Sequence, residues 1–147
     1  MTKEVIAAIR GLQFANEEDG DKIEVITPAE YYLRNGSHYL LYTETDEDTG
    51  GVTKNIVKFR DHSMELTKKG YVNVHMVFEE QKKNMTSYAT PFGNIMVGID
   101  TEKIMIEEDE KKIHVKVDYS LDVNYEQLAA CRIAIEICPK EAGRSLM

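Results

Sequence analysis

The amino-acid sequence predicts an all-β domain, a single antiparallel meander closed into a small β-barrel of about eight to ten strands. Apolar and polar residues alternate with a period of two in one run after another, and turn dipeptides separate these runs. Serial strands without crossover helices are typical of a meander, and closing it removes the long unpaired edges of an open sheet. A sandwich of two sheets remains an alternative, because periodicity does not distinguish the two architectures.

The clearest alternation lies in residues 112–123. Apolar and aromatic side chains occupy its odd positions, whereas Lys, His, Asp and Ser occupy its even positions. This pattern predicts a long strand with one buried face and one solvated face. We therefore expect Val115, and Ile135 in the last run of the chain, to be buried, and Lys116 and Glu136 to lie on the solvated faces.

Less regular runs complete the predicted sheet. In the first of them, residues 4–14, both parities are apolar, so its inward face cannot be assigned from the sequence. Residues 125–130 carry the only helical pattern, which is long enough for a single turn. The other predicted strands are residues 22–33, 38–44, 63–67, 72–79, 95–99, 104–106 and 131–137.

Turn residues separate these runs. Asp19-Gly20 and Asn35-Gly36 both suit type I′ hairpin turns, in which the two central residues adopt a positive φ. Further turns are expected where glycine or proline recurs, at residues 50–51, 69–70 and 91–93.

The length and charge of the chain limit its class. Its 147 residues suit one domain, which we place at residues 1–138 with a flexible polar tail at 139–147. The net charge of −8 argues against binding to nucleic acid or to an anionic membrane surface. No apolar run approaches the roughly 20 residues of a membrane span, and no signal-peptide pattern follows the first residues, so we expect a cytoplasmic protein.

The chain has no recognisable catalytic, metal or cofactor motif. Cys131 and Cys138 lie on one predicted strand, about 23 Å apart, too far for a disulfide. The four histidines lack metal-ligand spacing and are expected on the surface. Asp46 and Asp48 resemble the start of a calcium loop, but Ile56 stands where that loop needs a glutamate. We expect no cofactor and no metal.

Six short stretches resemble the DUF1934 family of uncharacterised, YwiB-like bacterial proteins. They are residues 9–13 (IRGLQ), 19–24 (DGDKIE), 39–44 (YLLYTE), 76–79 (MVFE), 88–93 (YATPFG) and 98–101 (GIDT). The resemblance extends over residues 3–137 and implies a calycin-type, lipocalin-like barrel, but it implies no reaction. The family often has arginine where this chain has Lys68, which lacks a planar guanidinium.

Four polar side chains form the candidate ligand-binding site: Tyr42, Glu44, Lys68 and Tyr119. Each continues an apolar row that would face the barrel interior. Seven methionines and eight tyrosines could line a cavity for an amphipathic molecule. We expect these four residues to converge on one cavity, although row-end charges at a solvated rim and tyrosines packed in the core are the competing explanation.

These observations favour a non-catalytic module that binds a small amphipathic ligand. One alternative is an enzyme with a polar cluster inside the barrel. Another is a protein-interaction domain that uses an outer face or a sheet edge, with a homodimer among its forms. Neither nucleic acid nor a membrane is an expected partner.

Overall fold

The computed structural model describes residues 3–11, 24–70, 73–90 and 93–140. Within these ranges the regular elements are ten strands and no helix. Among the described residues there is accordingly no helix with the length and apolar character that crossing a membrane requires. The strands are β1 (Glu4–Arg10), β2 (Glu24–Arg34), β3 (Ser37–Thr45), β4 (Val52–Arg60), β5 (Ser63–Gly70), β6 (Val74–Glu79), β7 (Lys82–Thr90), β8 (Gly93–Glu108), β9 (Ile113–Val123) and β10 (Glu126–Pro139).

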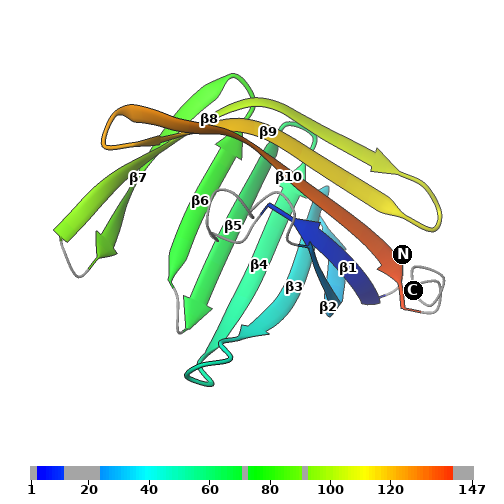
Figure 1. The fold of residues 1–147 in the computed structure, drawn as a ribbon. Coiled ribbons are helices and arrows are strands. Elements are labelled where there is room, and N and C mark those ends of the chain that lie inside the picture. The colour runs from blue at the N-terminus through cyan, green and yellow to red at the C-terminus, as the bar shows by residue number, and fades with distance from the viewer. Residues whose placement is uncertain (1–2, 12–23, 71–72, 91–92, 141–147) are drawn as a thin grey trace.

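All ten strands form one antiparallel sheet, in the order β6-β5-β4-β3-β2-β1-β10-β9-β8-β7. The first and last strands pair with each other, from Val5 opposite Pro139 to Arg10 opposite Ala134. The sheet curls round so that β7 to β10 lie across from β3 to β6 (Figure 1). The molecule is therefore a nearly closed barrel, which confirms the predicted meander and excludes the sandwich.

The barrel has a seam between β6 and β7, the two ends of the sheet. A short turn at Glu80 and Gln81 joins these strands, and side chains and backbone of this turn hold the seam together. One Glu80 carboxylate oxygen accepts a 2.8 Å hydrogen bond from the Ile104 amide, and the Gln81 amide donates to the Thr101 carbonyl at 2.9 Å. Across the seam itself, Asn84 Nδ2 of β7 donates to the Val77 carbonyl of β6 at 3.3 Å, so closure at this end depends on the turn and on this bond rather than on a ladder.

Strand β8 is longer than the sequence pattern indicates. The runs at 95–99 and 104–106 have opposite parity and were expected to be separate, yet they belong to one strand of 16 residues. A bulge between Thr101 and Lys103 shifts the pairing with β9. Because the extra residue reverses the alternation, Ile99 and Ile104 both face the core.

The turn at Asn35-Gly36 has the predicted conformation, whereas the turn before β10 differs from the prediction. Asn35 and Gly36 have φ values of 51° and 77°, as a type I′ turn requires. The helical turn expected at 125–130 is wrong, because Asn124 and Tyr125, at φ 49° and 69°, form a tight turn and β10 begins at Glu126. Residues 19–20 and 91–92 lie outside the described residues.

Inward rows from the other nine strands fill the interior, whereas the side chains that the structure describes on β7, those of residues 82–87, are exposed or partly exposed. Val115 and Ile135 are buried and Lys116 is exposed, as predicted. Cys138 is buried, whereas Cys131 is partly exposed. Strand β10 continues one residue beyond the expected domain end, to Pro139. The largest fully buried side chains are Phe59, Phe78, Ile9, Leu40, Met64, Leu66, Met76, Ile99, Ile113, Ile133, Ile135 and Ile137.

Candidate functional site

A polar rung crosses the inner wall of the barrel from β3 to β5. Tyr42 pairs with Asn55, and Asn55 pairs with Lys68. All three side chains lie on the inward face of their strands and are buried. Directly opposite residues in neighbouring strands have Cβ atoms about 5 Å apart, so these three form one continuous polar surface inside the barrel.

The buried amine of Lys68 is neutralised by Glu44. Its Nζ lies 2.6 Å from Glu44 Oε1, and the two side chains are 9% and 34% exposed. A buried ammonium without a partner would be strongly unfavourable, so this ion pair explains how lysine can occupy an inward position. The structure thus places Glu44 and Lys68 in contact, and their charges offset each other.

Tyr42 stands beside this pair as a neutral hydroxyl group. Burial, and next the nearby Glu44 carboxylate, raise the pKa of Tyr42 far above its ordinary value. The phenol therefore keeps its proton at any physiological pH and can both donate and accept a hydrogen bond.

Asn55 is the unusual member of the rung. It is 1% exposed, and neither Nδ2 nor Oδ1 has a hydrogen-bond partner. Leaving a buried polar group unpaired costs about 1–3 kcal/mol, and such groups are rare in folded proteins. Asn55 was not among the predicted site residues, because no strand was predicted at 52–60, although Thr53 and Asn55 share parity with Val57 and Phe59.

The barrel wall opens next to this rung, between β2 and β3. Their ladder runs from Arg34 opposite Ser37 to Glu30 opposite Leu41 and ends there. Beyond this point β2 pairs only with β1, and β3 pairs only with β4. Pro28 lies on the stretch of β2 that pairs with β1 but not with β3, and a strand with one free edge tolerates a residue without an amide hydrogen.

A pocket of about 570 Å³ occupies this opening. Such a volume suits a small-molecule site, for which about 300–1,000 Å³ is usual. Inward residues from four strands and outward residues at the rim line it together, so it passes from the outer surface to the polar rung. The inward lining residues are Val5, Ala29, Tyr42 and Asn55, and the outward ones include Pro28, Glu30, Leu41, Thr43, Lys54 and Ile56.

Tyr119 does not belong to this cluster. Its ring packs edge-on against Phe78, with ring centroids 5.0 Å apart. Phe78 pairs with Met64, whereas Lys68 pairs with Val74, four residues along β6, which is about 13 Å. The structure brings Tyr42, Glu44 and Lys68 together and places Tyr119 in a different part of the core.

A second buried polar group lies at the opposite end of β3. His38 was expected on the surface, but it is buried, because it faces inward opposite Phe59 and stacks on that ring. Its Nδ1 is 2.6 Å from the Tyr31 hydroxyl oxygen, and its Nε2 is 4.0 Å from a Glu108 carboxylate oxygen. Burial lowers the pKa of His38, and the carboxylates of Glu108 and Asp61 oppose this shift.

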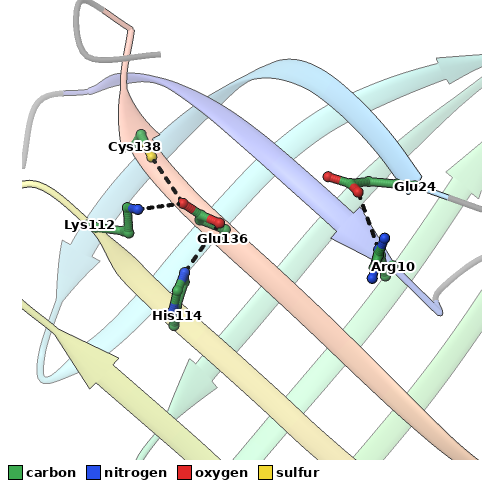
Figure 2. A network of polar contacts seen from close by, with 6 residues as sticks. All are labelled: Arg10, Glu24, Lys112, His114, Glu136 and Cys138. Atoms are coloured by element: carbon green, nitrogen blue, oxygen red, sulfur yellow. Dashed lines mark hydrogen bonds and ion pairs between the residues drawn. The ribbon is translucent and has the colours of Figure 1, made fainter. Parts of the chain in front are cut away.

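The outer wall carries a separate network of ion pairs (Figure 2). Glu136 is approached by Lys112 Nζ at 2.9 Å and by His114 Nε2 at 3.2 Å, and these contacts lower the pKa of Glu136. Glu136 lies on the outer face of β10, as predicted, and its side chain is partly exposed. Arg10 and Glu24 pair nearby. The described residues contain no group of three or more metal-ligating side chains placed to hold a metal ion.

The fold and the pocket define a small antiparallel β-barrel protein. The chain belongs to the DUF1934 family, a domain of unknown function, whose family model matches residues 8–135. It is similar to the uncharacterized β-barrel protein YwiB of Bacillus subtilis (strain 168), with 30% identity over 113 residues that cover 76% of this chain and 78% of YwiB. The predicted family is confirmed.

A solved structure supports the same fold. The crystal structure of the ywiB protein from Bacillus subtilis matches this chain with a TM-score of 0.66 and 22% sequence identity. The match covers 92% of this chain and 88% of that one. At 22% sequence identity, the similarity between the two structures supports the barrel architecture alone.

Proposed function

We propose that this protein is a non-catalytic binding module that takes a small amphipathic molecule at the opening between β2 and β3. The observation that carries the proposal is Asn55, a buried amide with both polar atoms unpartnered beside a pocket of about 570 Å³. A ligand that reaches Asn55 would satisfy these atoms and recover the energy that their burial costs.

The lining of the pocket supports an amphipathic ligand. Val5, Ala29 and Ile56 offer apolar surface, whereas Tyr42 and Asn55 supply polar groups at the inner end. Binding sites for small molecules commonly combine apolar walls with a few polar groups that fix orientation.

The state of the polar groups favours binding over catalysis. Lys68 is held by Glu44 at 2.6 Å, and Tyr42 keeps its proton because its pKa is raised. The rung thus presents a protonated hydroxyl, a neutral amide and a paired ammonium, a set of groups suited to hydrogen bonding a ligand.

Tryptophan fluorescence tests the proposal, because the chain contains no tryptophan. Thr43 and Thr45 are exposed threonines on the same face of β3, but only Thr43 lines the pocket. We expect the emission of Thr43→Trp to shift to shorter wavelength and to saturate when decanamide, decanol or decanoate is titrated in. The matched control, Thr45→Trp, should not respond.

Two outcomes would overturn the proposal. One is that no decyl compound shifts the emission of Thr43→Trp, and the other is that both variants respond equally. If mass spectrometry shows that the protein converts a bound compound into a product, the enzyme alternative would instead be favoured.

A further inference from the structure

We infer that the head group taken by this pocket is uncharged and presents a hydrogen-bond donor beside an acceptor, as a primary amide or a lactam does. The inference rests on the proposed binding function and specifies its ligand class.

Asn55 offers one donor group and one acceptor, and both are unpartnered. Its Nδ2 needs an acceptor, and its Oδ1 needs a donor. A carboxylate only accepts, and an ammonium only donates, so either would leave one atom of Asn55 unpaired in a buried place. An amide satisfies both atoms together, in the paired geometry that two amides adopt.

The charges around the pocket favour a neutral head group as well. Lys68 is already compensated by Glu44, so the rung has no net charge to offer. The outer lining carries Glu4 and Glu30 together with Lys54 and Lys140, which also balance. A buried charge without a counter-charge is strongly disfavoured, and an ionised ligand would have none at the rung.

Tyr42 completes the site on the other side of the rung. It pairs with Asn55 across β3 and β4 and lines the same pocket. Because the pKa of Tyr42 is raised, its hydroxyl stays protonated. It can donate a hydrogen bond to a ligand carbonyl oxygen, or accept one from the second N–H of a primary amide.

The test compares four decyl probes in the Thr43→Trp reporter: decanamide, N,N-dimethyldecanamide, decanoate and decylamine. We expect decanamide to bind about tenfold or more tightly than the other three, since each of these leaves a buried atom of Asn55 unpaired. Asn55→Leu should abolish this preference. Asn94→Leu, which changes an exposed asparagine of β8 outside the pocket, should keep it.

Thermal unfolding of the ligand-free protein gives a second readout. Replacing Asn55 by the similarly sized leucine removes two unpaired polar atoms, so we expect Asn55→Leu to raise the Tm by a few degrees. An asparagine with only a structural role would lower the Tm when it is replaced.

The possible failures are distinguishable. If no probe changes the emission, the proposed function fails together with the inference. If all four probes bind equally, or if Asn55→Leu lowers the Tm and leaves the preference unchanged, binding stands and the amide-type head group is overturned.

Discussion

Single residues show where a sequence is informative about this site and where it is not. The apolar rows ending in Glu44 and Lys68 indicated inward positions, and the two side chains meet at 2.6 Å. Tyr119 also faces inward, but parity gives only the face of a strand and not the height along the barrel. Asn55 was missed because its importance lies in the absence of partners, which depends on the packing of β3 and β5 around it.

His38 gives a prediction about pH at the scale of one residue. Its pKa is lowered by burial in the folded protein, whereas an unfolded histidine titrates near about pH 6.5. The unfolded state therefore binds the proton more readily, and the free energy of unfolding should fall as the pH drops below about 6.5. This fall should end once the pH is below the folded-state pKa of His38.

Urea unfolding at neutral and mildly acidic pH checks this expectation. The variant His38→Gln should lose less stability over this interval than the wild-type protein. Glu80 and Glu136 do not interfere, because their pKa values are lowered and their contribution is lost only below about pH 4.5. An equal loss in both proteins would show that another group is responsible.

At the scale of an element, the two faces of β9 and β10 should respond differently to truncation. Val115→Ala and Ile135→Ala remove buried side chains and should each cost about 2–4 kcal/mol in chemical unfolding. Lys116→Ala changes an exposed side chain and should stay within about 0.5 kcal/mol. Glu136→Ala should fall between them, since it breaks two ion pairs. Equal costs for Val115→Ala and Lys116→Ala would contradict the assigned faces.

The elements also show why part of the fold could not be predicted. Alternation was sufficient for β9 and for the Asn35-Gly36 hairpin, because both depend on neighbouring residues. The bulge after Thr101 arises from pairing with β9, and the opening beside Pro28 arises where β2 and β3 stop pairing. Features that depend on which strands meet, and how far they pair, leave little signal in one sequence.

At the scale of the whole molecule, the seam should be the most easily opened part of the described barrel. We expect backbone amides of β6 and β7 to exchange with deuterium faster than those of β4, which is paired on both sides. Glu80→Ala removes the acceptor of the Ile104 amide and should speed exchange there by about fivefold or more. Mass spectrometry of peptides from the exchanged protein measures both effects.

The matched control for the seam is Glu79→Ala. Glu79 precedes Glu80, and its carboxylate forms an exposed ion pair with Lys82. This variant should leave the exchange of Ile104 unchanged, and neither variant should affect the pairing of β1 with β10. Faster exchange throughout the barrel in Glu80→Ala would mean global destabilisation and would contradict a local role.

The pairing of β1 with β10 has a consequence for how the chain is made. A ribosome synthesises β1 first and β10 last, yet Val5 and Pro139 lie opposite each other in the finished sheet. The edge of β1 that pairs with β10 therefore stays unpaired while more than a hundred residues are added to the chain. We therefore expect the nascent chain to expose an unpaired strand edge, of the kind that promotes aggregation, until β10 has been synthesised.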